Sequence, residues 1–326
     1  MQSFLTAGRT LSELVEKLKE VVMAYKILEK KVISSNNKNY LAGKVYLPEG
    51  DIKGYFHVVH GMTEHIGRYD KFMQVLADNG YITFGYDHLG HGYTANDDSE
   101  LGFIAERNGD DLLAHDVKVF ADAMKEEYGE HPYYLMGHSM GSFVVRMATQ
   151  KYITPDKLIV MGTSGPNPIA GAGLLVCKLI RSLRGAKHIS PLIDSLAFGS
   201  YNSHFKDEND PRAWLTNDVD IRRKYDADKF CTFKFTVSAM HDLISMNKDC
   251  NTDEWFKSVA NKMPILLISG EDDPVGDYGK GIRICEEKLK ANGANVTTVI
   301  YPKYRHEILN DSSFDMTVND ILEFIK

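Results

Sequence analysis

Eight short runs of apolar, β-branched or aromatic residues constrain the fold of this chain of 326 residues more than any other feature. The runs span approximately residues 31–35, 41–47, 55–60, 82–86, 133–136, 158–161, 265–268 and 296–301. From the third run onward, most are separated by segments with helical periodicity, at residues 71–77, 110–128, 142–152, 280–291 and 314–325. This alternation predicts an α/β fold with an eight-stranded, mostly parallel sheet, helices on both faces and an antiparallel start.

The alternation stops after the sixth run. Residues 166–261 carry helix and turn signals but no convincing strand, so we expect a helical cap or lid inserted after the sixth strand. The core then consists of residues 30–165 and 262–326. Within the insertion, residues 169–183 combine apolar and basic side chains at helical spacing. This segment is either a helix packed on the core or a lid whose apolar face contacts an apolar substrate or a membrane surface.

Residues 1–29 precede the first run and form a separate N-terminal extension in this interpretation. Thr10 and Glu13 have the spacing of a capping box, and apolar residues then recur at steps of three and four from Leu11 to Leu28. The pattern predicts an amphipathic helix that begins near Thr10. Its end stays open, because residues 25–35 fit a strand equally well.

Charge and composition exclude several classes of function. The chain has 38 Lys and Arg against 45 Asp and Glu, a net charge of -7, and no basic segment able to hold a phosphate backbone. Nucleic acid is therefore not expected as a partner. No glycine-rich dinucleotide pattern follows the first parallel strand and no Walker pattern occurs, so no cofactor is expected either.

Cysteine usage points to a reducing compartment. The four cysteines lie far apart without a C-x-x-C pair, so we expect neither a metal site nor a disulfide framework: Cys177, Cys231, Cys250 and Cys285. The first residues lack the pattern of a signal peptide, and no run approaches the length of a membrane span. We therefore expect a cytoplasmic protein.

The pattern G-x-S-x-G at residues 137–141 falls where the fifth strand meets the following helix. The motif alone is a weak signal, but a sharp turn at this place strains the central residue and exposes its side chain. Small glycines on both sides relieve the crowding. The position therefore makes Ser139 a candidate nucleophile.

A serine hydroxyl needs a base to take its proton and a third group to orient that base. The loops after the seventh and eighth strands leave the same sheet edge as Ser139, and they carry Asp273 and His306. Asp273 precedes a proline, which favours an extended backbone and a side chain aimed across the loop. Glu271 and Asp272 stay open as alternatives for the acid.

A tetrahedral oxyanion requires two backbone N–H donors. One follows the nucleophile, at Met140, and the other is expected from Met62 in the loop after the third strand.

A separate cluster, Asp87 with His88 and His91, has residue types that can bind a metal. We interpret it as a structural turn, because no further ligand set is evident.

Five segments together resemble a known family: H-G-M-T-E-H-I-G-R-Y at residues 60–69, Y-D-H-L-G-H-G at 86–92, G-H-S-M-G-S at 137–142, D-P-V at 273–275, and H-E at 306–307. The resemblance is to the α/β-hydrolase superfamily, and within it to monoacylglycerol lipase and lysophospholipase-like hydrolases of the serine aminopeptidase S33 type. The first segment is the most specific, because it is long and unusual. The resemblance spans residues 40–326, and the extension before them departs from the family pattern.

The resemblance implies Ser139 as nucleophile, His306 as base, Asp273 as its partner, and an oxyanion hole from Met62 and Met140. It also implies an apolar tunnel for an acyl chain beneath the lid. The implied activity is cofactor-independent hydrolysis of a lipid-like carboxylic ester, a monoacylglycerol or lysophospholipid. Transient contact between the lid and a membrane surface is an expectation from residues 169–183 alone and is independent of the resemblance.

Other interpretations on the same fold are a proline-type aminopeptidase, a short-chain esterase or lactonase, and a binding module that has lost the reaction. Acyl length, head group and oligomeric state are left open by the sequence.

Overall fold

The computed structural model describes residues 25–326, and the helix predicted near Thr10 lies outside them. Eight strands form one sheet in the order β1-β2-β4-β3-β5-β6-β7-β8. Their bounds are β1 Tyr25–Ile33, β2 Tyr40–Pro48, β3 Gly54–Val59, β4 Tyr81–Tyr86, β5 Tyr133–His138, β6 Lys157–Met161, β7 Ile265–Gly270 and β8 Val296–Tyr301. Strands β3 to β8 pair in parallel, while β2 pairs antiparallel with both β1 and β4. The predicted fold class is confirmed.

The first strand begins at Tyr25, earlier than the run at residues 31–35 predicted. All nine of its residues pair with β2, from Tyr25 opposite Pro48 to Ile33 opposite Tyr40. This ladder pairs the backbone N–H and C=O groups of residues 25–33 with those of β2, so these residues do not continue the expected helix. Tyr25 and Leu28, which continued the apolar spacing of the expected helix, therefore belong to the sheet.

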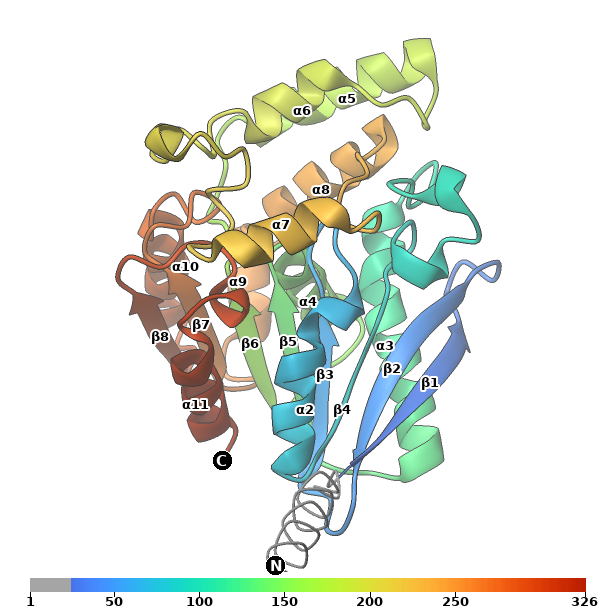
Figure 1. Ribbon diagram of the computed structural model, residues 1–326, viewed down its shortest axis with the longest axis vertical. Helices are drawn as coiled ribbons and strands as arrows, with labels where there is room; N and C mark the ends of the chain where they lie inside the picture. The colour runs from blue at the N-terminus through green and yellow to red at the C-terminus, as the bar shows by residue number, and fades with distance from the viewer. Residues whose placement is uncertain (1–24) are drawn as a thin grey trace, which may run out of the picture.

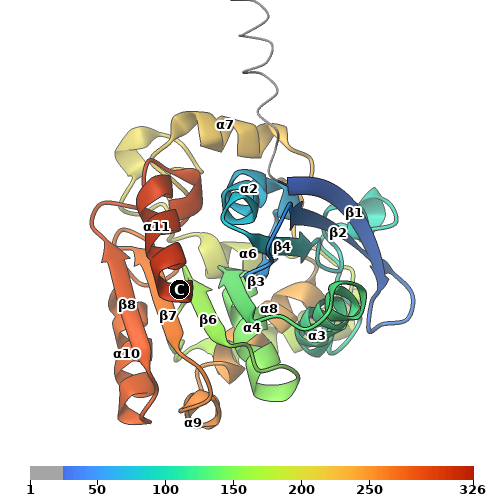
Figure 2. The ribbon, with the colours of Figure 1, turned by 90° about the horizontal axis from the view of Figure 1, so that it is seen from below.

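Both faces of the sheet are covered by helices (Figures 1 and 2). Helices α2 (Asp70–Asp78) and α11 (Phe314–Ile325) pack on one face. Helices α3 (Gly109–Tyr128), α4 (Met140–Lys151) and α10 (Lys280–Ala291) pack on the other. Because both faces are covered, β3, β4, β5 and β7 are buried along their whole length, which is why their sequences read as continuous apolar runs.

Residues 162–264, between β6 and β7, contain five α-helices and no strand. They are α5 (Ala170–Arg184), α6 (Pro191–Phe198), α7 (Val219–Ala227), α8 (Val237–Asp249) and α9 (Asp253–Val259). Figure 1 shows α5 and α6 as the outermost layer, above α7 and α8 and beyond the carboxyl ends of the parallel strands. Helices α8 and α9 bury side chains such as Met246 and Trp255 in the core cluster, so this part of the insertion is continuous with the core.

No helix within residues 25–326 is long and apolar enough to cross a membrane. All four cysteines are buried and free.

Candidate active site

Ser139 lies on the tight turn between β5 and α4. Its backbone is strained, with φ 54° and ψ -121°. A Cβ atom on Gly137 would lie 2.2 Å from the carbonyl oxygen of Gly141, and one on Gly141 would lie 2.2 Å from that of Val59. Only glycine fits at either position, so the two glycines allow the turn that exposes Ser139.

His306 and Asp273 are brought together by the loops after β8 and β7. His306 Nδ1 lies 2.8 Å from Asp273 Oδ2, and Asp273 Oδ1 accepts a hydrogen bond of 2.8 Å from Val275 N–H. Both side chains are buried. When Nδ1 donates to the carboxylate, Nε2 is left with a free lone pair. Of the three acids in this loop, Asp273 contacts the imidazole, while Glu271 is exposed and Asp272 is half-buried.

Ser139 and His306 open on the same cavity, which has a volume of about 810 Å³. The volume is in the range of small-molecule sites. Within the described part of the chain, no hydrogen bond joins Ser139 Oγ to His306. Such bonds are often long before substrate binds, and the shared cavity places both residues at one surface.

The insertion covers this cavity with one side of α5. Ala172, Gly173 and Val176 line it from that helix. Leu175 and Leu179, which belonged to the apolar face expected from the sequence, point outward and are 68% and 59% exposed. The helix carries apolar residues on two sides, so the sequence pattern did not distinguish the inner side from the outer one.

Met62 and Met140 also line the cavity. Within residues 25–326 their N–H groups have no hydrogen-bond partner. Met140 is the first residue of α4, where backbone N–H groups are free of helical bonds. A Cβ atom at Gly61 would lie 3.0 Å from that of Ser139, so a glycine there lets the Met62 loop approach the serine.

Three buried histidines hold the loop that contains Met62. His91 Nε2 accepts a hydrogen bond from Thr63 N–H (3.3 Å), and His60 Nε2 accepts one from His88 N–H (3.0 Å). Burial lowers the pKa of His88 to about 3 and that of His91 to about 4, and it holds the pKa of His60 well below its ordinary value. The neutral rings can therefore accept backbone hydrogen bonds at neutral pH.

Asp87 has a structural role in the same region. Its Oδ1 accepts a hydrogen bond from Ile66 N–H and its Oδ2 accepts one from Tyr93 N–H, both of 2.8 Å. Both oxygens thus fix backbone turns, in agreement with the interpretation of this segment as a turn.

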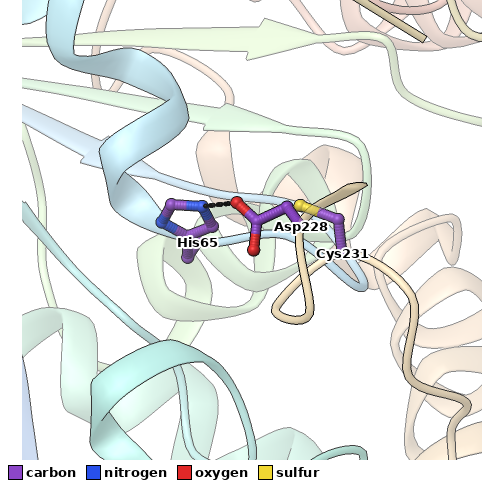
Figure 3. Close-up of side chains that lie close together, drawn as sticks. All are labelled: His65, Asp228 and Cys231. Atoms are coloured by element: carbon purple, nitrogen blue, oxygen red, sulfur yellow. Dashed lines mark hydrogen bonds and ion pairs between the residues drawn. The ribbon is translucent and has the colours of Figure 1, made fainter. Parts of the chain in front are cut away.

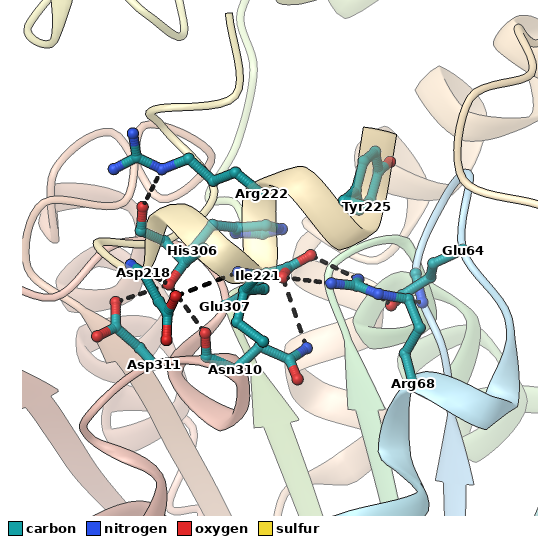
Figure 4. A network of polar contacts seen from close by, with 12 residues as sticks. Glu64, Arg68, Asp218, Ile221, Arg222, Tyr225, His306, Glu307, Asn310 and Asp311 are labelled. Carbon is teal, nitrogen blue, oxygen red and sulfur yellow. Dashed lines mark hydrogen bonds and ion pairs between the residues drawn. The ribbon is translucent and has the colours of Figure 1, made fainter. Parts of the chain in front are cut away.

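A buried charge network next to His306 was not foreseen from the sequence (Figure 4). Arg68 makes two hydrogen bonds to Glu307, of 2.7 and 2.6 Å, and one to Glu64 of 2.9 Å. Since Glu307 directly follows His306, this bidentate pair fixes the backbone that carries the imidazole. The four-residue spacing of Glu64 and Arg68 is the signal that could have revealed half of the network.

His138, the residue before Ser139, belongs to the same network. Its Nδ1 lies 2.8 Å from Tyr69 Oη and 3.4 Å from Glu64 Oε1, and its Nε2 lies 3.2 Å from the His306 carbonyl oxygen. Burial favours the neutral ring, but the hydrogen bond and charge of Glu64 raise the pKa of His138 above its ordinary value. The sequence assigned no role to this ring, which packs 4.7 Å from that of His306.

An eight-stranded sheet with a strained serine after β5 and an Asp–His pair after β7 and β8 defines an α/β-hydrolase. The model of the family described as serine aminopeptidase, S33, matches residues 50–313. The chain belongs to this family.

Two relatives and a solved structure are similar over large parts of the chain. A monoacylglycerol lipase of Mycolicibacterium smegmatis is 23% identical over 86% of this chain and 91% of its own. A monoglyceride lipase of Rattus norvegicus is 26% identical over 55% of each chain. A thermostable carboxyl esterase from Bacillus coagulans, solved in complex with glycerol, superposes with a TM-score of 0.87 at 29% identity, covering 92% of this chain and 97% of its own.

Proposed function

We propose that the chain is a carboxylic ester hydrolase that cleaves lipid-like esters, monoacylglycerols or lysophospholipids, through an acyl-enzyme on Ser139. The observation that carries the proposal is the position of Ser139 and His306 at one cavity beneath the insertion, with Asp273 hydrogen-bonded to His306 behind it. The relatives named above as monoacylglycerol and monoglyceride lipases support the same reaction.

In the proposed mechanism, His306 Nε2 takes the proton of Ser139 as the hydroxyl attacks the ester carbonyl. The N–H groups of Met62 and Met140 stabilise the tetrahedral oxyanion. The imidazolium, stabilised by Asp273, then protonates the leaving alcohol. Water repeats the cycle on the acyl-enzyme, with no cofactor.

The cavity wall favours an acyl chain over a small acyl group. Apolar side chains from α5, α6 and α8 line it, among them Val176, Phe198, Leu243 and Ile244. Burial of each methylene contributes about 0.8 kcal/mol, so several methylenes raise the specificity for long chains by orders of magnitude.

An aminopeptidase is disfavoured by the state of the acids in the cavity wall. Such an enzyme needs an unpaired carboxylate for the α-ammonium group of its substrate. The four acids that line the cavity are all in ion pairs among the described residues: Glu64 and Glu307 with Arg68, Asp194 with Lys234, and Asp226 with Arg212. An uncharged ester therefore suits the site better.

The outer side of the insertion is proposed to make transient contact with a membrane surface. Exposed leucines of α5 and α6 that do not line the cavity lie there, and basic residues accompany them: Leu175, Leu179, Leu183 and Leu192, with Lys178, Arg181 and Arg184. An apolar face flanked by basic residues is typical of interfacial helices. A cytoplasmic location is part of the same proposal, supported by the four free, buried cysteines.

The direct test is a hydrolysis panel of p-nitrophenyl esters from acetate to palmitate, with monoacylglycerols, lysophospholipids and aminoacyl amides beside them. We expect kcat/KM to rise with acyl length and the Ser139→Ala variant to be inactive throughout. Preference for acetate would indicate a short-chain esterase. Preference for the amides would indicate a peptidase, and either result would overturn the proposed substrate class.

A further inference from the structure

Three side chains with metal-binding atoms meet where the insertion touches the core (Figure 3). His65 lies in the loop after β3, whereas Asp228 and Cys231 follow α7. His65 Nε2 and Asp228 Oδ2 are 3.0 Å apart, although 163 positions separate the residues in the chain. With the Cys231 Sγ atom, these ligand atoms all lie within 4.8 Å of one another.

The turn that carries two of these ligands is already ordered. Asp228 Oδ1 accepts a hydrogen bond of 2.8 Å from Phe230 N–H, and the Asp228 carbonyl accepts one of 3.0 Å from Cys231 N–H. These bonds fix the carboxylate with its other oxygen toward His65. A tetrahedral zinc ion with bonds of about 2.0 to 2.3 Å separates its ligand atoms by roughly 3.2 to 3.5 Å. The observed separations, 3.0 Å between Nε2 and Oδ2 and at most 4.8 Å within the set, therefore require only small side-chain shifts to admit the ion.

The thiol of Cys231 is buried beside the other two side chains. Because the thiolate is the form that binds a metal ion, binding at this cluster displaces the thiol proton to solvent, so affinity increases with pH.

We propose that His65, Asp228 and Cys231 form a binding site for a thiophilic divalent cation, with zinc as the best fit. One nitrogen, one oxygen and one sulfur ligand suit the borderline-soft character of zinc, and water completes the tetrahedron. Calcium and magnesium, which prefer oxygen ligands alone, do not fit this donor set.

A bound cation would join the insertion to the loop that carries Met62. Thr63 already contacts the insertion, because Tyr225 Oη donates a hydrogen bond of 2.8 Å to its carbonyl oxygen. Cys231 itself lines the cavity. The cation therefore clamps the insertion to this loop beside the cavity and slows ester turnover reversibly. This consequence, unlike the binding itself, rests on the proposed function.

Binding is tested on the full chain without an affinity tag, by calorimetric titration with Zn²⁺ and by the absorption spectrum with Co²⁺. We expect Cys231→Ser, His65→Gln and Asp228→Asn each to weaken Zn²⁺ binding by about 100-fold or more, because loss of a mere hydrogen-bond partner of a ligand already costs a metal site up to that much. Cys231→Ser should also abolish the thiolate-to-cobalt charge-transfer band.

Matched controls are Cys177→Ser, a buried cysteine of α5, and His204→Gln, an exposed histidine away from the cluster. Both should bind Zn²⁺ as the wild type does. The circular dichroism spectrum of each variant checks that it is folded. Equal Zn²⁺ affinity in wild type and folded Cys231→Ser protein would overturn the site.

The clamp is tested by the ratio of ester turnover with and without Zn²⁺ in each variant, which removes any change in basal activity. The ratio should fall in the wild type and stay near one in Cys231→Ser. Tight Zn²⁺ binding without a change in the ratio would overturn the clamp while supporting the site. Reaction of Ser139 with a fluorophosphonate, measured without zinc, separates either result from a failure of the proposed function.

Discussion

The central strands of the sheet bury their side chains on both faces, whereas α5 and α6 of the insertion expose five leucines to solvent. Ser139 and Asp273 follow the buried strands β5 and β7, and His306 follows the edge strand β8. The turn at Ser139 tolerates almost no added atom. The residues assigned to substrate choice line the inner side of the insertion. In the proposed function, chemistry therefore depends on a closely packed sheet edge, and specificity depends on helices whose outer surface is open to other contacts.

The largest effect is expected at the sheet edge. Ser139→Ala and His306→Ala should each lower kcat on the best ester by about 10⁴- to 10⁶-fold, because the members of a triad act as a unit. The free energy of unfolding should change little. Steady-state kinetics with chemical denaturation checks both values, and retention of a tenth of kcat in either variant would contradict the assignment.

Substitutions at two neighbouring residues, Asp273 and Asp272, test which of them is the acid of the triad. Asp273→Asn should lower kcat by about 10⁴-fold, because the amide favours the wrong tautomer or orientation of His306. Asp272→Asn should have a far smaller effect, since Asp272 does not contact the imidazole. A reversed order in the measured rates would make Asp272 the third member.

Two glycine-to-alanine substitutions, one at the sheet edge and one in the insertion, compare how the two regions affect the free energy of unfolding. Gly141→Ala places its Cβ atom 2.2 Å from the Val59 carbonyl oxygen and should lower the free energy of unfolding by about 3 kcal/mol or more. Gly171→Ala meets no atom within 4 Å and, within helix α5, should raise it by up to about 1 kcal/mol. Denaturant titration measures both. A similar loss in the two variants would remove the distinction between tight core and open insertion.

Substitutions on the two sides of α5 are expected to affect different properties, ester specificity on the inner side and vesicle binding on the outer side. Val176→Asp puts a charge into the cavity wall and should lower kcat/KM on a long-chain ester by about 30-fold or more, but much less on acetate. Leu179→Asp on the outer side should leave both values nearly unchanged in the absence of lipid, and it should weaken binding to vesicles. Equal losses on both esters in the Val176 variant would indicate a merely structural helix.

The smallest effect is a pH dependence in α8. Burial raises the pKa of Asp242 to about 6, an effect that His241 offsets only in part. A folded pKa above the unfolded one means that stability is present at low pH and is lost as pH rises through 6. The unfolding free energy of Asp242→Asn minus that of the wild type should therefore be larger at pH 7.5 than at pH 5, by about 1 kcal/mol. A gain that is independent of pH would contradict the shift.

Periodicity and topology predicted the sheet and its helices because burial on both faces leaves continuous apolar runs. The same topology predicted that Asp273 and His306 would share an edge with Ser139. The inner and outer sides of α5 were not predicted, because Val176 and Leu179 are equally apolar in sequence and only tertiary packing distinguishes them.

The ion pair of Arg68 with Glu307 and the cluster of His65 with Cys231 were also missed. Their members are separated by more than 160 positions, and no local pattern links them. Only the folded insertion brings the second pair together.

The most direct test of the central claim is reaction of the folded protein with a fluorophosphonate probe, followed by peptide mapping. The account predicts a single adduct on Ser139, lost in Ser139→Ala and formed far more slowly in His306→Ala. Folded wild-type protein that stays unlabelled, or that carries the adduct on another residue, would contradict it.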